Sequence, residues 1–177
     1  MEKAVERIHS AMKRGEQIWI YGDYDTDGTT SASLLLNVFR HLGVQVNFYI
    51  PHRFDEGYGL NKEAMRKLRE DGCDLLITVD CGITSIEEVQ LANEIGMDVI
   101  ITDHHQPRPD ALPPAYTVIT PKMPESEYPF DGLAGVGLAF KLAHGLMGGT
   151  EMSPFLQSQL DLVALGTVVD VATLTGE

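Results

Sequence analysis

The sequence has little of what defines several large classes of protein. Two cysteines, Cys73 and Cys81, are too few for a disulfide framework and lack the spacing of a metal site. No run of 18 or more apolar residues is present, and residues 1–6 have no signal-peptide pattern. The chain is therefore expected to be cytoplasmic, with reduced thiols and no membrane contact.

Basic and aromatic residues are also scarce. Thirteen lysines and arginines stand against 26 aspartates and glutamates, so the formal charge is −13. Two bound divalent cations would return four of these charges and leave −9, which is still too negative for a broad nucleic-acid surface. Aromatic residues make up 7% of the chain. Trp19, Phe39 and Phe48 are expected in strands or on core-facing helix positions, which leaves few rings to stack on bases.

Helical and strand patterns alternate from residue 1 to about 120. Short apolar runs predict five strands, at residues 17–21, 44–50, 74–79, 98–102 and 116–120. Helical spacing, caps and terminal glycines predict helices at residues 2–14, 29–42, 61–70 and 85–96. Apolar strands separated by helices are typical of an α/β fold, here an open, mainly five-stranded parallel sheet with helices on both faces.

The alternation ends in the last third of the chain. Prolines are frequent across residues 106–131 and predict a loop around one short strand. Helices are predicted after it, at about 134–147 and 153–169. We expect one domain over residues 1–177, with the αβ sheet core at about 1–120 and a loop with a helical C-terminal segment at about 121–177.

Polar and charged side chains follow the ends of four predicted strands. They are Asp23, Asp25 and Asp27 after the first strand, His52 and Arg53 after the second, Asp80 after the third, and Asp103, His104 and His105 after the fourth. The carboxyl ends of parallel strands meet at one edge of a sheet, where such folds bind ligands. A helix cap or a turn explains any one of these residues, but four successive strands indicate a common site.

Two familiar sites share part of this pattern. The stretch DYDTDG, residues 23–28, has the spacing of half a calcium EF-hand loop, but Leu34 stands where that loop needs a glutamate, and a strand precedes it. The calcium site is therefore set aside. Receiver domains of signalling systems place an aspartate after the third strand and a lysine after the fifth, as Asp80 and Lys122 do here. A receiver binds one Mg²⁺ and has no use for Asp-His-His, so it stays only as a rival interpretation.

The donor set of the predicted site is hard oxygen with a little imidazole. This composition suits Mn²⁺ or Mg²⁺ better than Zn²⁺. So many carboxylates at one edge would repel one another and raise their own pKa values unless cations lie between them. Two divalent cations bridged by one carboxylate activate a shared water and bind a phosphoryl oxygen, which is the chemistry of phosphate ester or anhydride hydrolysis.

Four segments are similar, in order, to the motifs of the DHH phosphoesterase family. They are DYDTDG (23–28), VDCG (79–82), DHH (103–105) and ALGTVVDVATL (164–174). Three more segments resemble the branch of that family that degrades single-stranded DNA from 5′ to 3′ in bacterial DNA repair and recombination. They are IPHRFDEGYGLN (50–61), ITDHHQP (101–107) and LAGVGLAFKL (133–142). The resemblance covers nearly the whole chain.

The resemblance implies six ligands for two divalent cations, Mn²⁺ or Mg²⁺. They are Asp23, Asp25, Asp27, Asp80, His104 and Asp170. Within this set Asp25 and Asp27 would bind one cation each, and Asp80 would bridge both. His104 and Asp170 would complete one shell. Asp23, which is also counted among the catalytic residues, would complete or orient the other.

The resemblance also implies groups that act on the substrate. His105 would contact the phosphate or stabilise the developing charge, and Asp103 would support it from the side away from the metals. Arg53 is the best candidate for a phosphate contact, because its guanidinium group offers two parallel donors. Pairing of Arg53 with Asp55 or Glu56 is an equal alternative.

The glycine-rich residues 132–137 fit neither a Walker loop nor a dinucleotide fingerprint, and they are expected to allow close packing beneath the site. The expected function is metal-dependent phosphodiester hydrolysis by the catalytic lobe of a 5′→3′ single-stranded-DNA exonuclease, which alone would bind single-stranded DNA weakly. The second DHH-associated domain and the OB fold of that branch are expected to be absent from residues 1–177. The missing C-terminal domain would be the part that completes the cleft. Two alternatives stay open: a DHH hydrolase of short oligonucleotides or cyclic dinucleotides, and an inactive DHH scaffold.

Overall fold

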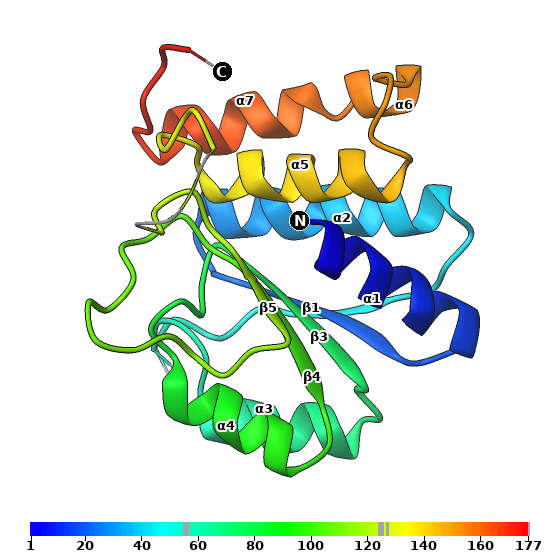
Figure 1. Cartoon of the computed structure of the whole chain (residues 1–177), viewed down its shortest axis with the longest axis vertical. Coiled ribbons are helices and arrows are strands. Elements are labelled where there is room, and N and C mark those ends of the chain that lie inside the picture. The colour runs from blue at the N-terminus through cyan, green and yellow to red at the C-terminus, as the bar shows by residue number, and fades with distance from the viewer. Residues whose placement is uncertain (55–56, 124–125, 127, 177) are drawn as a thin grey trace.

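The computed structural model describes residues 1–54, 57–123, 126 and 128–176, which form a parallel α/β structure (Figure 1). Five parallel strands pair in the order β2-β1-β3-β4-β5. They are β1 (Ile18–Gly22), β2 (Asn47–Tyr49), β3 (Leu75–Val79), β4 (Asp98–Thr102) and β5 (Thr117–Ile119). The chain runs outward from β1 to β2 and then crosses to β3, so β1 and β3 flank the switch point at which such sheets bind ligands. The predicted five-stranded parallel sheet is confirmed.

Helices cover both faces of the sheet, also as predicted. They are α1 (Glu2–Arg14), α2 (Thr26–His41), α3 (Lys62–Glu70), α4 (Ile86–Glu94), α5 (Gly135–Leu146), α6 (Pro154–Gln157) and α7 (Leu160–Val169). Figure 1 shows α1, α2 and α5 on one face and α3 with α4 on the other. The last helix, α7, packs against α2 and α5 and forms an outer layer. No helix in the described part of the chain is both long and apolar enough to cross a membrane.

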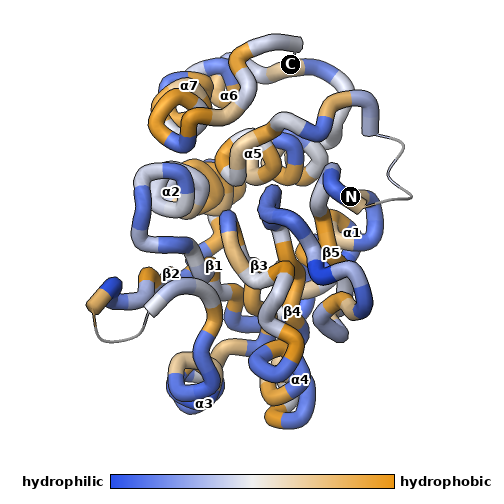
Figure 2. Tube along the Cα trace, turned by 90° about the vertical axis from the view of Figure 1, so that its left-hand side faces the viewer, coloured by the Kyte–Doolittle hydropathy of each residue, from blue (hydrophilic) through white to orange (hydrophobic). Residues whose placement is uncertain are grey.

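The sheet lies between two apolar cores. One core joins the sheet to α1, α2 and α5, and the other joins it to α3 and α4. Figure 2 shows hydrophobic residues along the strands and along the helix sides that face them. All five residues of β3 are buried, which explains why its sequence is a continuous apolar run instead of an alternating one.

Two helical predictions are wrong in detail. α2 begins three residues earlier than predicted, because the Asp25 carboxylate caps it by accepting a hydrogen bond from the Gly28 N–H at 2.9 Å. Asp27 therefore lies in the first turn of a helix. The helix predicted at 153–169 is divided into α6 and α7. Gln159, at the break, is buried and accepts a 2.9 Å hydrogen bond from Asn37 of α2, a tertiary contact with no local signal.

Two predictions near strand and helix ends also need correction. β2 spans three residues instead of the predicted 44–50; Phe48 lies in this strand, as predicted, and is 57% exposed. β2 is an edge strand, and its side chains are covered less than those of the central strands. Ser85 lies at the N-cap of α4 as predicted, but its side chain makes no capping hydrogen bond.

Candidate metal centre

The ends of three strands and two helices deliver six polar side chains to one edge of the sheet, called here the carboxyl edge. Asp23 follows β1, Asp25 and Asp27 lie at the start of α2, and Asp80 follows β3. His104 follows β4, and Asp170 ends α7. The structure therefore brings together all six residues for which the sequence predicted metal binding.

These residues form overlapping groups whose ligand atoms lie within 4.8 Å of one another. The groups are Asp23 with Asp25 and Asp80, Asp27 with His104 and Asp170, and Asp80 with His104 and His105. Asp80 belongs to two groups, and His104, which shares one of them with Asp80, also belongs to the group of Asp27 and Asp170. Asp80 therefore lies between Asp23 with Asp25 on one side and His104 on the other. A carboxylate in this position has the geometry to bridge two cations.

Three ligand atoms at the centre are buried without a hydrogen-bond partner in the described part of the chain. They are Asp23 Oδ1, Asp80 Oδ1 and His104 Nε2. Asp80 Oδ1 and His104 Nε2 lie 3.1 Å apart, although no hydrogen bond joins them. Adjacent ligands of one octahedral ion with 2.1 Å bonds lie about 3 Å apart. Because an unsatisfied buried polar atom is costly, this arrangement fits a divalent cation.

Three acids at this edge, Asp23, Asp27 and Asp80, have raised pKa values; the sequence predicted such a rise from repulsion between neighbouring carboxylates. Burial raises the pKa of Asp80 to about 9, and the charges of Asp27 and Asp25 add to the rise. Burial is also the largest cause of the raised pKa values of Asp27 and Asp23. Cations placed between these carboxylates would favour the ionised forms, so the site as folded is prepared for positive charge.

Asp27 is held by the start of α5, a feature that sequence reasoning missed. The Gly135 N–H donates to Asp27 Oδ2 at 2.6 Å, and the Val136 N–H donates to Asp27 Oδ1 at 2.8 Å. A side chain at Gly135 would place its Cβ 2.7 Å from the Cβ of Asp80. The glycine-rich segment thus allows close packing beneath the site, as predicted, and also supplies two backbone donors to a carboxylate.

Asp170 reaches the site because α7 packs closely on α2. A Cβ at Gly166 would lie 2.5 Å from Thr30 Oγ1 and 2.9 Å from Asp27 Oδ1, so only glycine fits. One turn later, the Asp170 N–H donates to the Gly166 carbonyl at 2.9 Å and ends the helix. Helical spacing alone could not assign Asp170, because its approach depends on this helix–helix contact.

Asp80 has a backbone conformation that is unusual for a residue with a side chain. Its φ is 61°, in the left-handed region, and its N–H donates to the Thr102 carbonyl at 2.9 Å. Such a conformation costs on the order of 1 kcal/mol and is tolerated best by glycine, asparagine and aspartate. The turn directs the Asp80 carboxylate toward the other ligands instead of continuing the strand.

Asp103 holds His105 and the loop after β3. Its Oδ1 accepts hydrogen bonds from His105 Nδ1 at 2.7 Å and from the His105 N–H at 3.0 Å, while Oδ2 accepts from the Ile83 N–H at 2.9 Å. The hydrogen bond with Asp103 is the main cause of the raised pKa of His105. Asp103 is 1% exposed, and both of its oxygens accept hydrogen bonds from His105 or Ile83, which fits the predicted supporting role.

Of two other residues named from the sequence, Arg53 lies at the margin of the site and Lys122 lies elsewhere. Arg53 is exposed, and its guanidinium carbon lies 5.3 Å from the ring centroid of Tyr24. Its alternative partners, Asp55 and Glu56, lie outside the described residues. Lys122, which the receiver interpretation would pair with Asp80, lines a different cavity beyond β5. Among the described residues, the ion pairs of Asp80 are with His104 and His105.

The fold and the site together define a parallel α/β protein with a carboxylate-rich centre suited to divalent metals. The chain belongs to the DHH family: the profile of the DHH family, N-terminal domain, matches residues 17–167. The chain is 51% identical over its full length to the single-stranded-DNA-specific exonuclease RecJ of Bacillus subtilis (strain 168), of which it covers 22%.

Solved structures agree with this assignment. The crystal structure of exonuclease RecJ bound to manganese matches 99% of this chain and 44% of its own, with a TM-score of 0.82 and 37% identity. A crystal structure of RecJ in complex with Mg²⁺ from Thermus thermophilus matches 99% of this chain and 21% of its own, with a TM-score of 0.58 and 26% identity. The chain thus spans less than half the length of each of these relatives.

Proposed function

We propose that this protein hydrolyses phosphodiester bonds with two divalent cations, Mn²⁺ or Mg²⁺. One observation carries the proposal. Three buried ligand atoms, Asp23 Oδ1, Asp80 Oδ1 and His104 Nε2, have no hydrogen-bond partner in the described part of the chain, and they belong to overlapping groups of metal-binding side chains. When bound, such a pair of cations lowers the pKa of a water and polarises a phosphoryl oxygen.

The ligand groups suggest how the two cations would be shared. Asp23 and Asp25 would hold one of them, and Asp27, His104 and Asp170 would hold the other, with Asp80 common to both. Asp27 keeps lone pairs for this role, because each of its oxygens accepts only one backbone hydrogen bond. These hydrogen bonds fix the position of the carboxylate before a cation arrives.

The side chains next to the cation groups supply the remaining roles. His105 is partly exposed and lies with its Nδ1 3.9 Å from Asp80 Oδ1, so it borders the place where a bound phosphate would lie. Asp103 fixes the orientation of His105 and raises its pKa, which favours the protonated form that stabilises negative charge. Arg53, on the segment after β2, would contact a phosphate group further along the substrate chain.

We propose single-stranded DNA as the substrate and 5′→3′ exonuclease cleavage as the reaction, which releases 5′-mononucleotides. The support is the 51% identity to a single-stranded-DNA-specific exonuclease and the match to manganese-bound RecJ. In this proposal residues 1–177 are the catalytic lobe, and a second DHH-associated domain and an OB fold would complete the DNA track. Residues 1–177 alone would then cleave short or activated phosphodiesters slowly.

The charge of the chain supports weak DNA binding by this lobe. Two cations leave a formal charge of −9, which provides no electrostatic attraction for a polyanion. Phe48, Phe54 and Tyr58 are 57%, 87% and 53% exposed and add some stacking surface. We expect the logarithm of affinity to fall with the logarithm of salt concentration with a slope of only about one or two.

One assay tests the proposal and separates its alternatives. A 5′-labelled single-stranded oligodeoxynucleotide should be degraded with Mn²⁺ and remain intact with EDTA, and long strands should yield intermediates instead of being consumed processively. Cleavage of two- to four-nucleotide oligomers or cyclic dinucleotides, with longer strands left intact, would favour the short-substrate hydrolase. Bound Mn²⁺ without cleavage of any of these substrates would favour an inactive scaffold.

A further inference from the structure

The connection between β2 and α3 places a tyrosine beside His105. Gly57 and Gly59 flank Tyr58, and both have φ values in the left-handed region, 77° and 80°. Glycine adopts this conformation without the steric penalty that other residues incur. The chain bends at Tyr58 and Gly59, and the Tyr58 ring lies beside His105, just after β4.

The backbone that carries Tyr58 is fixed to the sheet. Tyr21, fully buried in β1, donates a hydrogen bond from its hydroxyl to the Gly59 carbonyl at 3.0 Å. The Tyr21 ring also stacks on Tyr49 of β2, with ring centroids 5.3 Å apart. Gly59 and Leu60 are buried as well. Tyr58 is therefore attached to a rigid part of the fold even though its own side chain is half exposed.

The Tyr58 hydroxyl reaches both nitrogens of the His105 ring. Its oxygen lies 3.2 Å from Nδ1 and 3.3 Å from Nε2, and the two rings meet at an interplanar angle of 78°. Asp103 already accepts a hydrogen bond from Nδ1, so the hydroxyl pairs with Nε2: it donates to Nε2 of the neutral imidazole and accepts from the Nε2–H of the protonated form. His105 is thus restrained on one side by a carboxylate and on the other by a phenol.

The second restraint matters because His105 has open space beside it. Tyr58, His105 and Asp103 share the lining of a cavity of about 330 Å³ with Gly82 and Ser85. A hydrogen bond through Nδ1 alone leaves the imidazole able to pivot about that bond. The tyrosine blocks this movement and keeps the ring facing Asp80.

We propose that Tyr58 is a positioning residue that acts through His105 in the hydrolysis described above. The proposal rests on the proposed function for the step in which His105 takes part. The positioning itself is a property of the folded chain and can be measured without substrate. Tyr58 would neither bind a metal nor contact the reacting phosphorus, because its hydroxyl is directed at the imidazole.

Replacing Tyr58 by phenylalanine removes the hydroxyl and keeps the ring. With Mn²⁺ and a 5′-labelled single-stranded oligodeoxynucleotide, we expect kcat to fall about 5- to 10-fold, the effect of one lost neutral hydrogen bond. KM and the number of bound Mn²⁺ ions should not change. In a His105→Ala background, the Tyr58→Phe substitution should have no further effect, because the group it positions is absent.

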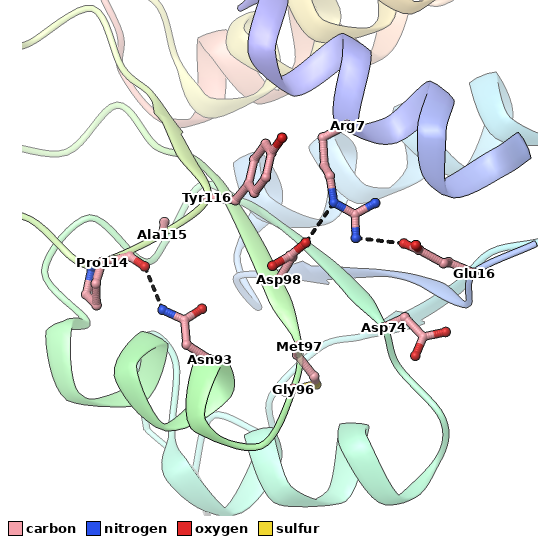
Figure 3. A pocket seen from close by; sticks show the side chains of 10 residues that line it. All are labelled: Arg7, Glu16, Asp74, Asn93, Gly96, Met97, Asp98, Pro114, Ala115 and Tyr116. Atoms are coloured by element: carbon pink, nitrogen blue, oxygen red, sulfur yellow. Dashed lines mark hydrogen bonds and ion pairs between the residues drawn. The ribbon is translucent and has the colours of Figure 1, made fainter. Parts of the chain in front are cut away.

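A matched control is available at the opposite edge of the sheet. The Tyr116 ring lies beneath Lys3, whose Nζ is 4.7 Å from the ring centroid, and close to the Arg7 guanidinium group (Figure 3). Tyr116→Phe keeps these ring contacts and removes a hydroxyl far from the metal centre. Its kcat and KM should equal those of the unmodified protein.

A second measurement does not depend on activity. Proton–nitrogen NMR spectra of the Mg²⁺-containing protein, labelled with ¹⁵N in histidine rings, should show a shifted Nε2 signal of His105 in Tyr58→Phe, with the His104 signals unchanged. If the protein shows this shift but cleaves no substrate, the positioning role of Tyr58 is supported and only the proposed function is refuted. An unchanged His105 signal, or an equal fall in kcat in the His105→Ala background, would overturn the proposal for Tyr58.

Discussion

The two edges of the sheet both gather acidic side chains, but they differ in where the balancing charge comes from. At the amino edge, where the strands begin, Arg7 pairs with Asp98 and Glu16 at 2.7 Å each (Figure 3). At the same edge, Arg69 pairs with Asp74 at 2.9 Å. At the carboxyl edge, the ion pairs made by acids among the described residues are with histidines alone.

The pKa of an aspartate is therefore shifted in opposite directions at the two edges. A backbone hydrogen bond from Gln17, helped by Arg69, lowers the pKa of Asp74, whereas burial and neighbouring acids raise that of Asp80. Cavity size does not identify the metal centre, because the cavity lined by residues 106–112, about 680 Å³, and that at the amino edge, about 610 Å³, both exceed the cavity of about 330 Å³ beside His105. The difference shows that the acids of the amino edge are balanced by arginines of the chain itself, while those of the carboxyl edge need cations from outside the chain.

The largest expected effect is that of Asp80→Asn, because Asp80 is shared between two ligand groups. Asparagine tolerates the left-handed backbone, so the fold should survive. We expect Mn²⁺-dependent hydrolysis to fall to background and Mn²⁺ to stop raising the melting temperature. Metal analysis and calorimetry check both effects. Asp98→Asn, the same change at the amino edge, should retain hydrolysis and metal. Turnover near that of the unmodified protein in Asp80→Asn would refute the two-metal assignment.

The next effect separates the two histidines. His105→Ala should lower the rate by about 10²-fold or more, the scale of losing one donor to the transition state, while the number of bound Mn²⁺ ions stays the same. His104→Ala should lose a cation, because His104 Nε2 lies 3.7 Å from Asp27 and 3.8 Å from Asp170. Metal content by elemental analysis, measured beside turnover, distinguishes them. Loss of an ion in His105→Ala would mean that the two roles are reversed.

The sequence predicted the sheet well because its signals are local. The continuous apolar run of β3 and the cap at Asn61, which accepts a hydrogen bond from the Ala64 N–H, placed these elements to within a residue. The acids after β1, β3 and β4 were predicted to meet because parallel strands end at one edge. The start of α2 was predicted three residues late, because Asp25 serves both as the helix cap and as a member of a ligand group.

The parts of the site that the sequence did not reveal depend on distant contacts. The backbone donors of Gly135 and Val136 meet Asp27 across more than 100 residues, and they carry no side-chain signal. Tyr58 meets His105 across 47 residues. Asp170 could be named only through family resemblance, because its place depends on how α7 packs. The spacing of apolar residues predicts a helix or a strand, but it does not predict which helix or strand ends will meet in the folded protein.

A smaller effect concerns pH in the metal-free protein. The pKa of Asp80 is about 9 in the folded state and about 3.9 when unfolded, so its stabilising contribution is complete below about pH 4 and is lost as pH rises toward 9. We expect the free energy of unfolding with EDTA to fall by on the order of 2 kcal/mol or more between pH 5 and 9. Saturating Mn²⁺ should remove this fall, because metal binding favours the ionised ligands. Urea unfolding at several pH values measures it, and a fall of equal size in Asp80→Asn would assign it to other groups.

The smallest expected effect tests whether the amino edge serves stability alone. Arg7 is 7% exposed and joins α1 to Asp98 and Glu16, so Arg7→Met removes a charge-assisted hydrogen bond from Asp98, which water reaches, and an ion pair from the buried Oε2 of Glu16. We expect a loss of about 1–2 kcal/mol in the free energy of unfolding.

The more exposed pair of Arg69 and Asp74 should contribute less, so Arg69→Met should lower the free energy of unfolding by about 0.5 kcal/mol. Turnover and Mn²⁺ content should not change in either variant, because neither arginine lies at the carboxyl edge. A fall in turnover in Arg7→Met at full metal content would show that the two edges are coupled through the sheet.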